Sequence, residues 1–281
     1  MSILWRIRDQ IHDLSQRGMI MGVLNVTPDS FSDGGQFIDA GRAVEHGLQM
    51  IADGADIIDV GGESTRPGAD PVSVDEELRR VVPIIEKLRC ETSILISVDT
   101  MKAEVARAAV AAGADILNDV NGFRDPALVE VAASSEVGLI VMHMLGTPRT
   151  MQKNPVYTNV IENVRGFFTE RLATLQKAGI VPERVALDPG FGFGKTVEHN
   201  LTMLREMDKL RIDQHPMAIG VSRKSMIARL LEDQQIENRF WPTVALTAWI
   251  RNAGAEIARV HEVKPNVEAM RMMEAIMQSG H

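Results

Sequence analysis

An acid followed by a glycine-rich loop is the stretch of this sequence best suited to chemistry. The apolar run Val185-Ala186-Leu187 ends at Asp188, and residues 189–195 then read PGFGFGK. Short apolar runs closed by Pro and Gly are typical of strands. A phosphate-binding loop would need glycine six residues before its lysine, where Pro189 stands. Asp188 is therefore the stronger signal, because a carboxylate at the end of a buried strand needs a polar partner.

Seven further apolar runs end on a polar residue in the same way. Their closing residues are Asn25, Asp59, Asp99, Asn118, His143, Ser222 and His261. Successive run ends lie roughly 20 to 45 residues apart, about the length of a strand, a helix and two loops. The sequence therefore predicts an α/β fold, a single-domain TIM (β/α)8 barrel.

Helical patterns fill the intervals between these runs. We predict helices at about 40–53, 73–89, 102–112, 126–135, 158–178, 197–209, 224–232, 241–253 and 265–278. Apolar residues near helical spacing also occur within residues 3–16. We therefore predict that residues 1–18 form an N-terminal helical extension covering the bottom of the barrel, and that residues 19–281 form the barrel.

Composition narrows the class of protein. A chain of 281 residues suits one barrel, which typically takes about 250. A net charge of −8 with no basic tract argues against a nucleic-acid partner. No apolar run approaches the roughly 20 residues of a membrane span, and Arg6, Arg8 and Asp9 interrupt any signal peptide. A single cysteine, Cys90, excludes an intrachain disulfide, so we expect a cytoplasmic protein.

In such barrels the active site lies at the C-terminal ends of the strands, so the polar residues that end the runs should meet at one mouth. A structural role stays open for each, since Asp59 and Asp119 could be buried residues that fix loops, and Asn25 or His261 alone would more often be structural. The expected convergence of these polar residues at one mouth favours a ligand-binding site, because polar residues with only structural roles would be spread over both faces of the barrel. Residues 222–225, SRKS, open a predicted helix, where donors and cations favour an anionic or carbonyl-bearing ligand. Helix capping would explain Ser222 but not the adjacent Arg223 and Lys224.

Two long segments resemble the signature segments of dihydropteroate synthases. Residues 25–35 read NVTPDSFSDGG and residues 59–68 read DVGGESTRPG. Shorter matches are SVDT at 97–100, MHM at 142–144, DPGFGFGK at 188–195, SRKS at 222–225 and RVHEVK at 259–264. The resemblance covers about residues 19–275. It implies a cytoplasmic homodimer of folate biosynthesis that joins 7,8-dihydropterin-6-ylmethyl diphosphate to 4-aminobenzoate, releasing pyrophosphate and 7,8-dihydropteroate.

The resemblance also implies a pterin pocket, carried to the matching positions Asp99, Asn118, Met142, Asp188 and Lys224. A carboxylate can accept two parallel N–H bonds, as Asp188 would from the pterin edge. Asp99 and Asn118 would bind other ring nitrogens, Lys224 would donate to the carbonyl, and Met142 would pack on the ring.

For the other groups the resemblance implies two further sets of residues. Thr65, Arg66, Arg259 and His261 would bind the diphosphate, with Mg²⁺ held by phosphate oxygens and Asn25. Phe31, Pro67, Phe193 and Ser222 would surround 4-aminobenzoate or an inhibitory sulfonamide that mimics it.

The substrates favour a dissociative, SN1-like substitution, because diphosphate leaves well once cations neutralise it and an arylamine is a weak nucleophile. We take Asp33, Arg66 and Lys224 as catalytic, with Asp33 stabilising the pterin methylene cation. Arg66 could serve the 4-aminobenzoate carboxylate, the pyrophosphate or Asp33. The polar, glycine-bearing segments 27–35 and 62–68 suit loops ordered by ligand. We therefore expect 4-aminobenzoate to bind only after pyrophosphate or the pterin diphosphate.

Two segments depart from the family pattern. The family opens with an N-terminal hairpin, whereas residues 1–16 look helical, and Phe240-Trp241-Pro242-Thr243 replaces a small-residue pattern. The second segment lies near the helices expected to form the dimer, so it affects the interface rather than the pocket.

Three other functions remain open. A pterin-binding barrel of corrinoid methyl transfer should lack both signature loops and the RVH of residues 259–261, all present here. A Schiff-base aldolase would use Lys224, and borohydride trapping would reveal it. A non-catalytic folate-binding paralogue would have no need for Asp33 and Arg66.

Overall fold

The structure is a computed structural model that describes residues 2–26, 36–65 and 68–279, with side chains of the second range described from residue 40. Eight parallel strands form one sheet in the order β8-β7-β6-β5-β4-β3-β10-β9. They are β3 (Met19–Asn25), β4 (Ile57–Gly61), β5 (Leu95–Asp99), β6 (Ile116–Asp119), β7 (Gly138–Met142), β8 (Val185–Asp188), β9 (Ala218–Ile219) and β10 (Ile257–Val260). A parallel bridge from Leu187 to Met217 joins the two ends of the sheet, so the predicted barrel is confirmed.

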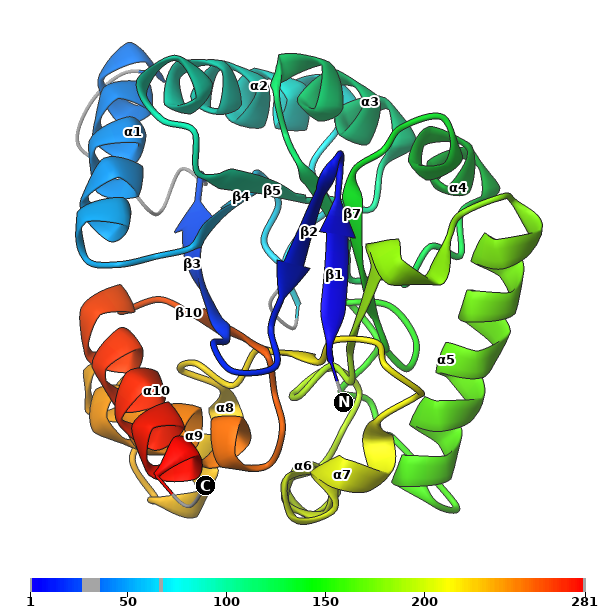
Figure 1. Ribbon diagram of the computed structural model, residues 1–281, viewed down its shortest axis with the longest axis vertical. Coiled ribbons are helices and arrows are strands. Elements are labelled where there is room, and N and C mark those ends of the chain that lie inside the picture. Colours follow the sequence, from blue (N-terminus) through cyan, green and yellow to red (C-terminus); the bar gives the residue numbers. More distant parts are fainter. Residues whose placement is uncertain (1, 27–35, 66–67, 280–281) are drawn as a thin grey trace.

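Helices surround the sheet on the outside (Figure 1). They are α1 (Gln36–Ala52), α2 (Val74–Glu91), α3 (Ala103–Ala112), α4 (Pro126–Ala133), α5 (Val160–Lys177), α6 (Val197–Arg205), α7 (Met207–Leu210), α8 (Ser225–Leu230), α9 (Phe240–Asn252) and α10 (Val263–Gln278), with short 3-10 turns at Pro182–Arg184 and Glu237–Arg239. Each helix predicted between residues 40 and 278 is present, although the one expected at 197–209 is interrupted at Glu206. Within the described ranges, no helix is long and apolar enough to span a membrane.

The helix predicted near the N-terminus is wrong. Residues 4–13 form a hairpin of β1 (Leu4–Ile7) and β2 (Gln10–Asp13), with Trp5 opposite His12. The spacing of the apolar residues suits both a helix and a strand. In the structure Trp5 and Ile7 alternate with exposed or half-buried neighbours, as in a half-buried strand. Arg8 makes the turn in the left-handed region, at φ 54°, and its Nε donates to Asp115 Oδ1 at 2.8 Å.

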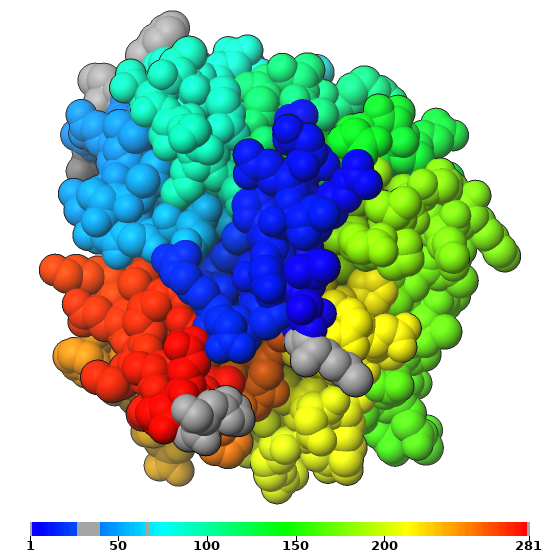
Figure 2. Space-filling view, viewed as in Figure 1, coloured from blue at the N-terminus to red at the C-terminus, as the bar shows by residue number. Residues whose placement is uncertain are grey.

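The hairpin nevertheless covers the predicted end of the barrel (Figures 1 and 2). Trp5, Ile7 and Leu14 pack in one buried cluster with Met19, Met21, Ile57, Ile116, Ile140, Ala186, Ala218 and Ile257, which come from the strands. The Trp5 indole N–H donates to Arg184 O at 3.0 Å. Since this cluster fills the end where the strands begin, the opposite end is left to bind ligands.

Candidate active site

An arginine crosses the barrel interior to two carboxylates on other strands, Asp59 within β4 and Asp99 at the end of β5. Arg259 of β10 donates from Nε to Asp59 Oδ2 at 2.6 Å and from Nη2 to Asp99 Oδ2 at 2.8 Å. Asn118 Nδ2 also donates to Asp59 Oδ2, at 3.2 Å. Sheet register brings these groups together, because Gly61 of β4 pairs with Asp99 of β5, and Asp99 pairs with Asn118 of β6.

The two carboxylates are buried and the guanidinium is half-buried, so each charge depends on the others. Burial raises the pKa of Asp99, while the Arg259 guanidinium opposes that rise. Asp59 is fully buried, and its Oδ1 has no hydrogen-bond partner among the described residues. An unpaired buried acceptor is costly unless a ligand supplies a donor. Asp59 therefore belongs to the site, a role that the sequence left open beside a structural one.

Asp188 starts the glycine-rich loop and is bonded to it. Its Oδ1 accepts the Gly190 N–H at 2.7 Å, and burial raises its pKa against the lowering effect of that bond and of Lys224. Gly190 has φ 69°, and a Cβ there would lie 2.0 Å from His143 O, so only glycine fits.

The same loop carries a buried aromatic ring, Phe193. Phe193 packs with Met142, Val120, Met144 and Met151 in a small buried cluster. Lys224 Nζ lies 4.0 Å from the centre of the Phe193 ring, a cation–π contact. Burial lowers the pKa of Lys224 to about 8. Met142, Phe193 and Lys224 therefore lie together, and their predicted roles toward the pterin and 4-aminobenzoate stay predictions.

Lys195, the last residue of the loop, serves the loop itself. Its Nζ donates to Gly190 O at 3.0 Å and to Phe193 O at 3.1 Å, and it lies 3.0 Å from His143 Nδ1. Burial lowers the pKa of Lys195 to about 7 and that of His143 to about 2. A neutral His143 can accept a hydrogen bond from Lys195. The bonds of Lys195 to His143 and to the carbonyls of Gly190 and Phe193 therefore hold the loop in shape.

Ser222 and His261 lie on the loops that follow β9 and β10. Ser222 Oγ is 2.9 Å from His261 Nδ1 and accepts the His261 backbone N–H at 3.2 Å. Arg223 between Ser222 and Lys224 has φ 56° and forms an ion pair with Glu262. With this backbone conformation, Arg223 pairs with Glu262 after β10, while Ser222 contacts His261 and Lys224 contacts the Phe193 ring.

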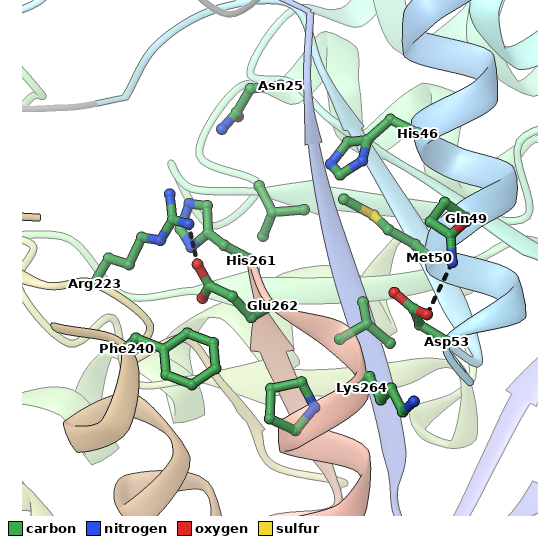
Figure 3. A pocket seen from close by; sticks show the side chains of 13 residues that line it. Asn25, His46, Gln49, Met50, Asp53, Arg223, Phe240, His261, Glu262 and Lys264 are labelled. Carbon is green, nitrogen blue, oxygen red and sulfur yellow. Dashed lines mark hydrogen bonds and ion pairs between the residues drawn. The ribbon is translucent and has the colours of Figure 1, made fainter. Parts of the chain in front are cut away.

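A cleft of about 460 Å³ opens beside His261 between α1 and the start of α10 (Figure 3). Asn25 and His261 lie on its wall with His46, Lys264 and the Arg223–Glu262 pair. Among the described residues, no group of three or more His, Cys, Asp and Glu side chains could hold a metal ion. Asn25, a single neutral oxygen donor, suits an ion that arrives with phosphate oxygens rather than a resident metal.

The segment after β4, residues 62–72, is called loop two. Glu63 Oε1 accepts the Val72 N–H at 3.1 Å, which ties the two ends of loop two together. Lys102 forms ion pairs with both Glu63 and the fully buried Glu77 of α2. Sequence reasoning missed Glu63 and Lys102, although Glu63 lies within the second signature segment and Lys102 follows Asp99 by three residues.

Several predicted site residues are not brought to these contacts. Thr65 is half-buried and directly precedes residues 66–67. Phe31, Asp33, Arg66 and Pro67 lie outside the described residues, so their roles stay predictions.

A family model and a curated relative both match most of the chain. The family model described as "Pterin binding enzyme" matches residues 21–261. The dihydropteroate synthase of Escherichia coli (strain K12) is 46% identical over 260 residues, which cover 92% of each chain.

Solved structures are similar throughout the chain. A Xanthomonas albilineans dihydropteroate synthase with 4-aminobenzoic acid has TM-score 0.92 and 42% identity, covering 99% of both chains. A Yersinia pestis enzyme in a sulfonamide drug complex has TM-score 0.91 and 42% identity, covering 98% of this chain and 99% of its own. A Burkholderia cenocepacia enzyme complexed with 7,8-dihydropteroate has TM-score 0.90 and 39% identity, covering 99% and 98%. The chain therefore belongs to the dihydropteroate synthase family, the transferases of folate biosynthesis.

Proposed function

We propose that this chain joins 7,8-dihydropterin-6-ylmethyl diphosphate to 4-aminobenzoate, releasing pyrophosphate and 7,8-dihydropteroate. The observation that carries the proposal is the half-buried Arg259 held by Asp59 and Asp99 at the mouth that also holds Asp188 and Lys224. Acceptors for ring N–H groups thus lie beside cations suited to a diphosphate. The relatives crystallised with 4-aminobenzoic acid and with 7,8-dihydropteroate support the same substrates.

The pterin would bind at the carboxylate side of the site. Asp188 would accept from the amino group and a ring N–H, while Asn118 and Asp99 would bond to other ring nitrogens. Lys224 would donate to the ring carbonyl, and Met142 would pack against the ring. Asp59 Oδ1, a buried acceptor without a partner among the described residues, adds a position for a further donor.

The diphosphate would lie at the Arg259 and His261 side. Within the described part of the chain, Arg259 Nη1 makes no hydrogen bond, so this nitrogen could donate to a phosphate while Nε and Nη2 keep their carboxylates. Thr65 and Arg66 would add donors from loop two. Asn25 would hold Mg²⁺ together with phosphate oxygens and water, and the bound ion would neutralise charge on the leaving group.

The second substrate would lie near Phe193, Ser222, Phe31 and Pro67, and a sulfonamide would take its place, as the Yersinia pestis complex supports. Departure of pyrophosphate would precede attack by the amine, since the arylamine is a weak nucleophile. Asp33 would stabilise the cation that develops on the pterin methylene. We expect 4-aminobenzoate to bind measurably only with pyrophosphate or the pterin diphosphate present.

The test is a reaction with both substrates and Mg²⁺, followed by pyrophosphate release and by detection of 7,8-dihydropteroate. Pyrophosphate that appears without 4-aminobenzoate would report simple hydrolysis. Failure to form dihydropteroate in a folded protein at saturating substrates would refute the proposal.

We also propose a cytoplasmic homodimer formed through α9 and α10. Exposed apolar side chains gather there, with Trp241 at 73%, Met272 at 66% and Ile276 at 60% of full exposure. Single exposed apolar residues are ordinary, but several on two helices in contact indicate a covered face. Sedimentation of the wild type and of Trp241→Glu would test it, and a monomeric wild type would refute it.

A further inference from the structure

Lys102 joins loop two to a helix that lies outside the barrel. It directly precedes α3, and its ammonium forms ion pairs with Glu63 of loop two and with Glu77 of α2. The Glu77 side chain is fully buried, and those of Glu63 and Lys102 are 11% and 20% exposed. Burial tends to lower the pKa of Lys102, but its hydrogen bonds with both carboxylates outweigh burial and raise the pKa. Lys102 is therefore a cation held between two anions, where loss of one partner is costly.

The backbone of Lys102 is fixed to the end of β5. Its N–H donates to Thr100 Oγ1 at 3.2 Å, and the Thr100 N–H donates to Asn118 O at 3.1 Å. Thr100 is buried and follows Asp99, which binds Arg259. The Lys102 side chain therefore starts from a fixed point beside the strand ends that form the mouth.

Glu63 connects this fixed point to both ends of loop two. Its Oε2 binds Lys102, and its Oε1 accepts the Val72 N–H at 3.1 Å. The preceding residue, Gly62, packs against α2, because its carbonyl accepts from Arg80 Nη1 at 2.8 Å and a Cβ there would lie 2.8 Å from a side chain of that helix. Residues outside the predicted substrate-binding sets therefore attach loop two to α2 and α3.

Thr65 follows Glu63 by two residues. Two residues of extended chain span at most about 7 Å, so fixing Glu63 limits where the Thr65 hydroxyl can lie. We propose that Lys102 and Glu63 are positioning residues that fix the start of loop two so that Thr65 can donate to the diphosphate. The inference rests on the proposed function, in which Thr65 binds the diphosphate.

The first test is hydrogen exchange of the ligand-free protein, followed by NMR at the Val72 amide. Glu63→Gln keeps the Lys102–Glu77 ion pair, so this variant should stay folded, but its one amide oxygen can replace only one of the two carboxylate oxygens. The Val72 amide should exchange about tenfold faster in Glu63→Gln and in Lys102→Met, since each variant loses a hydrogen bond between charged groups. Exchange at the wild-type rate in either folded variant would overturn the inference.

Arg89→Met is the matched control. Arg89 joins the other end of α2 to Asp115 by an ion pair and to Gly113 O after α3 by a hydrogen bond of 2.9 Å. The control should therefore lower the Tm and leave both Val72 exchange and pyrophosphate affinity unchanged. Equally fast Val72 exchange in Arg89→Met would trace the effect to the packing of α2 on α3 and overturn the inference.

Calorimetric titration with pyrophosphate and Mg²⁺ tests the consequence for the ligand. Glu63→Gln should raise the Kd about tenfold, the effect of losing one hydrogen bond to a charged group. Adding Thr65→Val to Glu63→Gln should cause little further loss, because both changes remove the same bond. Losses that add in full, or a wild type that does not bind pyrophosphate, would overturn the inference. A wild type that shows these effects on binding but forms no dihydropteroate would refute the proposed function alone.

Discussion

Asp188→Asn tests the pterin pocket, because the structure fixes which way the new amide turns. Asp188 Oδ1 accepts the Gly190 N–H at 2.7 Å. Gly190 is confined against His143 O, so the loop has no room to shift. The amide oxygen must keep the Gly190 bond, and the NH₂ group must then occupy the position of the second carboxylate oxygen. A donor would face the N–H donors of the pterin.

The expected loss follows from the bonds that change. A hydrogen bond to a charged group contributes about 1.5–3 kcal/mol, and a buried donor left without an acceptor costs about 1–3 kcal/mol more. A total of about 3–4 kcal/mol corresponds to a Kd raised several-hundred-fold, since about 1.4 kcal/mol is one factor of ten. Burial raises the pKa of Asp188, so a neutral amide removes an unfavourable buried charge and the ligand-free protein should stay folded.

Calorimetric titration with the pterin diphosphate, beside thermal unfolding, measures both quantities. Asp119→Asn is the matched control, because both oxygens of this buried carboxylate accept from loop amides, at 2.7 Å from Asn121 and 2.6 Å from Phe123. The control should lose stability and keep pterin affinity. An unchanged Kd in folded Asp188→Asn would remove Asp188 from the pocket, and an equal loss in Asp119→Asn would trace the effect to the fold.

Three further changes test other parts of the site. Asn25→Ala should raise the Mg²⁺ concentration needed for half-maximal activity and leave the Tm nearly unchanged; a collapsed Tm with the same Mg²⁺ dependence would make Asn25 structural. Asp33→Ala should lower kcat far more than pterin affinity, because it acts on charge that develops in the transition state; full turnover would contradict that role. Lys195→Met tests the buried lysine, whose pKa burial lowers to about 7. Between pH 7 and 10 the unfolded chain binds more protons than the folded one, so wild-type stability gains up to about 1.4 kcal/mol per pH unit. Urea unfolding at pH 7 and 9 should show a larger gain in the wild type than in the variant, which keeps the contribution of Lys224, and equal gains would refute it.

The barrel and the mouth could be predicted because parallel strands buried on both faces are continuous apolar runs. A polar residue that interrupts such a run, as Asp99 and Asp188 do, marks the strand's C-terminal end. The hairpin could not be predicted in this way, since strands of four residues are too short to separate a period of 2 from 3.6. Trp5 shows its role only through partners far along the chain, such as Arg184.

Side-chain partners across the barrel could not be predicted from local sequence patterns, for a similar reason. Arg259 and Asp59 are 200 residues apart, and their bond depends on which strands face each other after closure. The resemblance assigned Arg259 to the diphosphate alone, whereas the structure also bonds it to Asp59 and to Asp99, a residue that the resemblance assigned to the pterin. A cation held by two buried carboxylates is oriented before the substrate arrives, so little reorganisation is needed when charge develops on the leaving group.

The same pairing with Asp59 and Asp99 limits how strongly Arg259 attracts a free anion. Arg259→Lys should therefore lose more in kcat than in pyrophosphate affinity, because a lysine cannot contact both carboxylates in the planar geometry of a guanidinium. Equal losses in both would show that Arg259 serves only to bind the anion.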